Sequence, residues 1–268
     1  MQKNIHQKVL KNGLHIIVAP KKDSPTVAVQ LWYNVGSKHE KDGEKGLAHL
    51  LEHMIFKGTT TLAESDINLI ASKLSGYCNA FTSYDYTGYV FDIPVANWEK
   101  ILPIMADCMY NFTCKQDFLN SELKAVIQEL KMYKDMYNRS LLEEMTSAIF
   151  VDHPYHYPII GFKQDLWNMT RESLLAFYKQ HYAANNACLV IVSDVDVEKT
   201  MQEVTRIFGA LPAGTPKREE EYYINKDLVG KSVRLVRDVQ QAIGMVAYTA
   251  PGLKERKDYL LEVENLVS

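Results

Sequence analysis

Alternating hydrophobic and polar positions predict several β-strands in the first hundred residues. Alternation on both sides of a turn at 11–13 predicts a hairpin over residues 7–19. Residues 26–35 predict a longer strand whose apolar side chains share one face. Two shorter strands are predicted at 79–82 and 88–93, joined by a turn. We therefore expect the beginning of the chain to contribute most of a β-sheet.

Farther along, apolar residues recur every three or four positions, which is the spacing of an amphipathic helix. Helices are predicted over 47–56, 63–72, 96–112, 117–137, 140–150, 171–181 and 197–208. Residues 187–192 predict one more buried strand, and 151–165, which contain prolines, predict an ordered loop. Because strands and helices mix without regular alternation, the pattern favours an α+β fold. We expect an antiparallel or mixed sheet with helices packed on one face.

The composition changes after residue 208. Residues 209–221 combine glycine, prolines and a run of charges, which is typical of a linker. We therefore expect a catalytic zinc-binding domain over residues 1–215. Residues 216–268 would then hold the linker and the truncated start of a second, homologous domain.

A weak internal repeat supports this division. Strands are predicted at 232–238 and 242–250, and a helix at 254–267. The stretch that begins at Ala242 has a pattern like that beginning at Val27, and each precedes a charged loop and a helix. Two unrelated β-rich stretches of similar composition are the alternative interpretation.

Composition excludes several classes of partner. Hydrophobic residues make up 47% of the chain and charged residues 24%, as in ordinary globular proteins. The net charge of −3 gives no reason to expect nucleic acid or an anionic membrane surface as partner. The four cysteines form no Cys-x-x-Cys pair, so we expect reduced thiols rather than a zinc knuckle or disulfide framework.

The N-terminus lacks the apolar core and cleavage site of a signal peptide. Other apolar runs are of strand length, too short to span a bilayer. We therefore expect a soluble cytoplasmic protein. A periplasmic location is left open, because a chain that starts after a removed signal would look the same.

The sequence His49-Leu-Leu-Glu52-His53 carries candidate chemistry. On a helix, His49 and His53 lie one turn apart on the same face, where both imidazoles can reach one metal ion at about 2.0–2.1 Å. Zinc lowers the pKa of its bound water to about 7, and Glu52 is placed to accept a proton as that water attacks a carbonyl. The pattern therefore predicts metal-assisted hydrolysis of the inverted HxxEH type. The alternative is two satisfied core histidines on an apolar helix.

A catalytic zinc needs a third protein ligand and an open position. The predicted helix 117–137 offers Glu122 and Glu129, which lie seven residues apart and therefore on one face. Glu129 stands among apolar residues, so its carboxylate is expected to be partly buried and to need a partner. A solvated helix with regularly spaced charges is the alternative, and the spacing does not decide between them.

The chain resembles a known family over most of its first 210 residues. The matching segments begin with Asn12-Gly13-Leu14 and 26–36, and the others are Gly46 to Thr59, Asn79 to Thr87, Val126 to Leu130, His153 to Gly161, Phe177 to Tyr182, 185–187 and 208–209. They are similar to the pitrilysin/insulinase-type zinc peptidases (family M16), most closely the branch that includes the mitochondrial processing peptidase.

The resemblance implies roles for residues that spacing alone leaves open. The family's third zinc ligand falls on Glu129 and its accessory glutamate on Glu122, which would support a ligand histidine. We thus expect one Zn²⁺ per chain, although Mn²⁺ or Co²⁺ would accept the same ligands. In such enzymes a peptide substrate pairs with the strand that falls on Asn79, Ala80, Phe81 and Thr82. The neighbouring Cys78 is expected to be a small buried residue.

Family members carry two homologous halves, and the second supplies an Arg-Tyr pair to the site. This implies that a second half or a partner chain completes the enzyme. We therefore expect a zinc metalloendopeptidase that acts on peptides or unfolded proteins. A non-catalytic or partner-dependent subunit is one alternative, against which the retained HxxEH residues count. A metal-dependent lyase of the S-ribosylhomocysteine type, which also uses an inverted HxxEH, is another.

Overall fold

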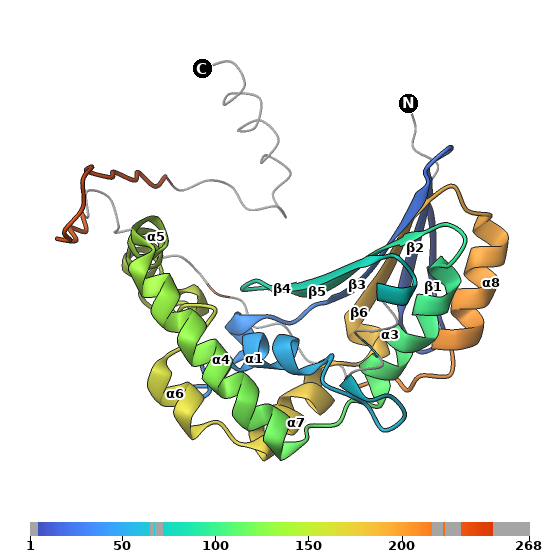
Figure 1. Cartoon of the computed structure of the whole chain (residues 1–268), viewed down its shortest axis with the longest axis horizontal. Coiled ribbons are helices and arrows are strands. Elements are labelled where there is room, and N and C mark those ends of the chain that lie inside the picture. The colour runs from blue at the N-terminus through green and yellow to red at the C-terminus, as the bar shows by residue number, and fades with distance from the viewer. Residues whose placement is uncertain (1–4, 65–66, 68–71, 216–221, 223–231, 249–268) are drawn as a thin grey trace.

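A computed structural model describes residues 5–64, 67, 72–215, 222 and 232–248. Six strands form one mixed sheet in the order β1-β2-β6-β3-β5-β4 (Figure 1). The strands are β1 (His6–Val9), β2 (His15–Pro20), β3 (Thr26–Tyr33), β4 (Tyr77–Thr82), β5 (Thr87–Pro94) and β6 (Ala187–Ser193). Only β2 and β6 pair in parallel; the other neighbours are antiparallel. The predicted α+β fold with a mixed sheet is confirmed.

Side chains alternate between buried and partly exposed along strands such as β3 and β6, so the sheet has one buried face. In β3 the side chains of Val27, Val29, Leu31 and Tyr33 are buried, whereas the residues between them are half-buried. The helices lie on one side of the sheet, and most of them cover its buried face (Figure 1). They are α1 (Leu47–Met54), α3 (Ile101–Tyr110), α4 (Gln116–Asp135), α5 (Tyr137–Ile149), α6 (Lys163–Asn168), α7 (Arg171–His181) and α8 (Val197–Phe208).

The helix α1 lies in the interior of this layer. Leu47, Ala48, Leu50, Leu51 and Met54 are buried, which leaves only the polar residues of the helix partly exposed. Helix α4 packs against α1 through buried residues such as Val126 and Leu130. Helix α5 buries no residue of its own and lies at the far end of α4, away from the sheet (Figure 1). Among the described residues, no helix is both long and apolar enough to cross a bilayer.

Several predicted elements need correction. The loop predicted over 151–165 ends in helix α6, which begins at Lys163. The helix predicted over 96–112 begins only at Ile101, after a single 3₁₀ turn. Cys78 is exposed, not buried, because β4 is at the edge of the sheet; all four cysteines are free thiols.

The strands predicted at 232–238 and 242–250 are wrong over the described residues, because 232–248 contain no strand. A strand needs a hydrogen-bonded neighbour, and these residues join neither edge of the described sheet. Side chains such as Val246 remain exposed there. The helix predicted at 254–267 and most of that at 63–72 lie outside the described residues. The division into domains at residues 215 and 216 stays a prediction.

Candidate metal centre

Two structural features determine where α1 begins. Gly46 precedes the helix with a φ of +98°, and a Cβ atom there would lie 2.5 Å from the Ile160 carbonyl oxygen. The buried Glu40 carboxylate accepts hydrogen bonds from the backbone N–H groups of Gly46, at 2.9 Å, and Ala48, at 2.7 Å. These bonds satisfy backbone N–H groups that the first turn of a helix would otherwise leave without a partner. The segment 36–46 therefore anchors α1, which the sequence pattern did not reveal.

Replacing Gly46 by alanine is expected to destabilise the metal-free protein by about 3 kcal/mol, because backbone strain and a clash with Ile160 add together. Gly43 is the matched control. It also has a positive φ, +81°, but no atom lies within 4 Å of the place that a Cβ atom would take. The free energy of unfolding of Gly43→Ala should therefore fall by only about 1 kcal/mol. Urea unfolding of both variants measures the difference. Equal decreases in the free energy of unfolding of the two variants would contradict the role of the close contact at Gly46.

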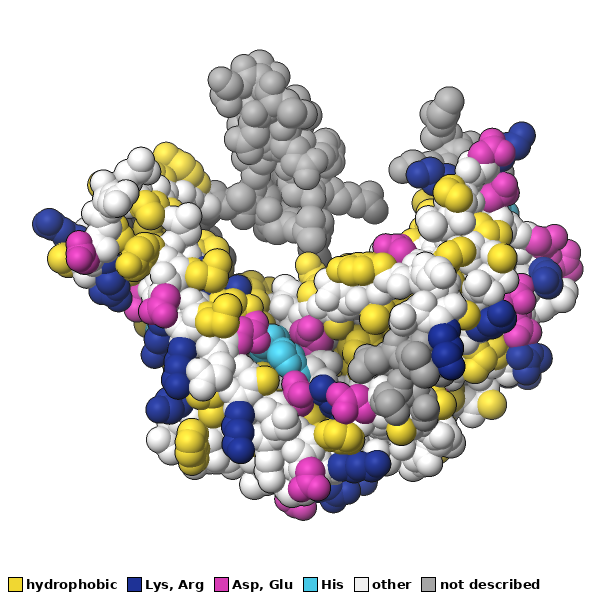
Figure 2. All heavy atoms as spheres, viewed as in Figure 1, with side chains coloured by type: hydrophobic (Ala, Val, Ile, Leu, Met, Phe, Trp, Pro, Cys, Tyr) yellow, Lys and Arg dark blue, Asp and Glu magenta, His cyan; other side chains and the backbone are white. Residues whose placement is uncertain are grey.

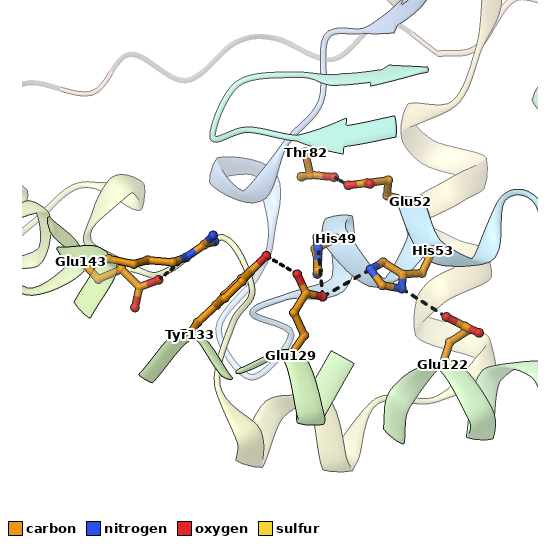
Figure 3. A network of polar contacts seen from close by, with 9 residues as sticks. His49, Glu52, His53, Thr82, Glu122, Glu129, Tyr133 and Glu143 are labelled. Carbon is orange, nitrogen blue, oxygen red and sulfur yellow. Dashed lines mark hydrogen bonds and ion pairs between the residues drawn. The ribbon is translucent and has the colours of Figure 1, made fainter. Parts of the chain in front are cut away.

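Three side chains of the predicted set converge on one point. Atom Oε2 of Glu129 lies 3.8 Å from Nε2 of His49 and 3.6 Å from Nε2 of His53 (Figure 3). These separations exceed hydrogen-bond length, but two ligands of one tetrahedral zinc lie about 3.3 Å apart. The candidate ligand atoms of all three residues lie within 4.8 Å of one another. The donor set of two imidazoles and one carboxylate therefore fits a zinc ion.

His49 provides an independent test of this fit. Among the described residues it makes no hydrogen bond, and its Nδ1 atom is buried without a partner. The other ring nitrogen, Nε2, faces Oε2 of Glu129 at 3.8 Å, beyond hydrogen-bond length, so it is available to bind a metal. Burial, together with the nearby His53, lowers the pKa of His49 to about 4. The ring is therefore neutral at neutral pH, which is the form that binds metals.

His53 is held in a defined orientation by neighbours on α4 and beyond α1. Its Nδ1 atom lies 3.1 Å from Oε2 of Glu122, so an N–H there donates to the carboxylate and leaves Nε2 free to bind a metal. Lys57 contacts the other Glu122 oxygen at 2.9 Å. The structure therefore places Glu122 behind a candidate ligand, as the resemblance implied. Sequence reasoning missed Lys57, because nothing in the local pattern indicates its distant partner.

Glu52 stands apart from the three candidate ligands. Its Oε2 atom accepts a hydrogen bond from the Thr82 hydroxyl at 2.6 Å (Figure 3). Burial raises the pKa of Glu52, while the Thr82 hydrogen bond and His53 act in the opposite direction. The side chain is thus fixed beside the cluster by β4. The hydroxyl of Thr82, one of the four residues predicted to bind substrate, is thus bonded to Glu52, and its contact with substrate stays a prediction.

The other predicted substrate residues lie on the same strand. Asn79 and Phe81 are exposed, and Ala80 is half-buried. β4 pairs only with β5, so its other edge is free within the described sheet. Figure 2 shows histidine and acidic side chains gathered in a hollow beside α4. The free edge of β4 and the candidate metal ligands therefore belong to one region of the surface.

A further polar residue reaches the cluster from α4. The Tyr133 hydroxyl donates a hydrogen bond to Oε1 of Glu129 (Figure 3). Sequence reasoning missed Tyr133, although its position four residues after Glu129 puts both side chains on one helix face. That spacing is the signal that would have identified it.

Comparison with known proteins identifies the family. Residues 16–163 match the model of insulinase, peptidase family M16, and residues 168–267 match that of the peptidase M16 inactive domain. An uncharacterized zinc protease of Rickettsia felis is 30% identical over 241 residues, covering 90% of this chain and 58% of the relative. A probable mitochondrial-processing peptidase subunit beta of Arabidopsis thaliana is 27% identical, covering 85% of this chain and 43% of that protein.

A solved structure agrees with these matches. The crystal structure of a protease from Helicobacter pylori is 31% identical, superposes with a TM-score of 0.77, and covers 83% of this chain and 54% of that one. The chain thus spans about half the length of the relatives it matches. None of these relatives supports a lyase of the S-ribosylhomocysteine type. The chain belongs to the insulinase family of metallopeptidases, peptidase family M16.

Proposed function

We propose that this chain carries the zinc site of a metalloendopeptidase that hydrolyses bonds in peptides or unfolded proteins. The observation that supports this most is the convergence of His49, His53 and Glu129 beside Glu52, a carboxylate left out of the ligand set. Three protein ligands with a general base next to them are the arrangement of a catalytic metal, whereas structural zinc sites use four protein ligands. We propose one Zn²⁺ per chain.

Each residue has a separate task in this proposal. Bound zinc would supply Lewis-acid chemistry that activates water and polarises a carbonyl near neutral pH. Glu52 accepts the proton of the attacking water and passes it to the leaving amine, and the Thr82 hydroxyl keeps its carboxylate in place. Glu122 keeps the Nδ1 proton on His53 and thereby orients that ring.

The free edge of β4 is a reason to propose a peptide as the substrate. A peptide that adds to this edge forms backbone hydrogen bonds without regard to its side chains. Only an extended, unfolded segment can pair in this way, because folded backbone has already used its hydrogen-bonding groups. Since Thr82 at the end of β4 bonds to Glu52, a peptide on that edge would pass the base. We therefore propose that Asn79, Ala80, Phe81 and Thr82 present the strand that binds substrate.

A second candidate function is that of a partner-dependent subunit. The chain spans about half the length of its relatives, and one of these carries the name of a peptidase subunit. In this alternative the zinc site is retained, but cleavage needs residues of a second half or a partner chain. The two candidates agree on the metal and differ on whether this chain cleaves alone.

Incubation of the zinc-loaded chain with a library of quenched fluorescent peptides tests the proposal. We expect cleavage that a chelator abolishes and that added zinc restores, because His49, His53 and Glu129 are the only group among the described residues that could bind a metal ion. Absence of cleavage by a chain that demonstrably holds zinc would contradict independent activity and favour the partner-dependent subunit. Cleavage that persists in chelator would contradict the metallopeptidase itself.

A further inference from the structure

The two oxygens of Glu129 have different surroundings. Oε2 faces His49 at 3.8 Å and His53 at 3.6 Å, which makes it the candidate metal ligand. Oε1 accepts the hydrogen bond of the Tyr133 hydroxyl (Figure 3). A free carboxylate can bind a metal through one oxygen or through both. The Tyr133 hydroxyl therefore occupies Oε1, the carboxylate oxygen that would otherwise be available for a second bond to the metal.

Tyr133 is itself held in place. The guanidinium of Arg139 lies over its ring, 3.2 Å from the centroid. Arg139 comes from α5, the helix that follows α4 directly, and its Nε atom is 3.4 Å from Oε1 of Glu143. A cation stacked on the face of an aromatic ring is attracted by it and restricts its rotation. The contact with Arg139 thus fixes the ring that fixes Glu129.

We propose that Tyr133 is a positioning residue that holds Glu129 as a one-oxygen metal ligand and so keeps one coordination position open. The inference rests on the proposed zinc site and adds a requirement to it. A catalytic zinc needs a position for water and substrate beside its three protein ligands. Without the Tyr133 hydrogen bond, the Glu129 carboxylate could rotate. It would then no longer be held in the orientation that binds the metal, and its second oxygen could fill the open coordination position.

The variant Tyr133→Phe tests this inference. It keeps the ring under Arg139 and removes only the hydroxyl, so the fold should be retained. We expect the dissociation constant for zinc, measured by competition with a chromophoric chelator, to rise at least about tenfold. The visible spectrum of the cobalt-substituted chain should also change toward higher coordination. Tyr137→Phe, at an exposed tyrosine next to the same helix junction, is the control and should change neither quantity.

The outcomes separate this inference from the proposed function. A wild-type chain that binds no zinc overturns both. If the wild type binds zinc and Tyr133→Phe binds it equally well, only the role of Tyr133 is overturned. Weaker zinc binding with an unchanged cobalt spectrum would place the effect outside the coordination shell and would also overturn it. Weaker binding together with a changed spectrum, seen in Tyr133→Phe alone, supports it.

Discussion

Replacing Glu52 by glutamine is expected to slow peptide cleavage by about two to four orders of magnitude, while zinc remains bound. Glutamine has nearly the same shape, and its carbonyl oxygen can still accept the hydrogen bond from Thr82. It cannot, however, take up a proton from the attacking water. Measurement of kcat/KM with a quenched peptide, together with the zinc content of the same preparation, checks both parts of this expectation.

Glu144→Gln is the control for this experiment, because Glu144 is an exposed residue of α5 and the substitution removes the same charge. Its cleavage rate should stay close to that of the wild type. A Glu52→Gln enzyme within tenfold of the wild-type rate would contradict the role of Glu52 as a base. Loss of zinc in Glu52→Gln would instead assign the carboxylate to the ligand set.

The second large effect is expected at Glu129. Glu129→Gln should weaken zinc binding by more than about 100-fold, because it removes the only anionic ligand of the cluster. The amide oxygen can still accept the Tyr133 hydrogen bond, so the helix should be unchanged. Competition titration gives the dissociation constant, and thermal unfolding of the metal-free protein checks that the variant is folded.

A double variant distinguishes position from charge. Gln128 is exposed on α4, so Gln128→Glu combined with Glu129→Gln restores the net charge but turns the carboxylate away from the two histidines. The double variant should bind zinc as weakly as Glu129→Gln alone. Recovery of wild-type affinity in the double variant would show that net charge matters more than the Glu129 position.

Local patterns predicted the part of the site that lies within one helix. His49, Glu52 and His53 are three residues of one short motif, and burial of the apolar positions of α1 leaves these three partly exposed. Glu129 is different, since spacing along α4 did not distinguish a ligand from a solvated charge. Its assignment came from the family resemblance, and the structure brings it to the two histidines.

Contacts between distant segments were beyond the reach of the sequence patterns. The bond from Thr82 to Glu52 depends on the position of β4 relative to α1, and that from Lys57 to Glu122 on the packing of α4. The buried Glu40 is another example, since it caps α1 from the segment that precedes this helix. The strands predicted after residue 231 failed for a related reason. Alternation indicates a preference for extended backbone, but only a neighbouring strand can satisfy its hydrogen bonds.

The metal content of the purified wild-type chain tests the central claim most directly. Mass spectrometry that distinguishes zinc, manganese and cobalt should find about one zinc ion per chain, retained through dialysis, because His49, His53 and Glu129 form a three-ligand site. The same measurement on Glu129→Gln should find little or none. A wild-type chain that holds no metal after exposure to zinc would contradict the account.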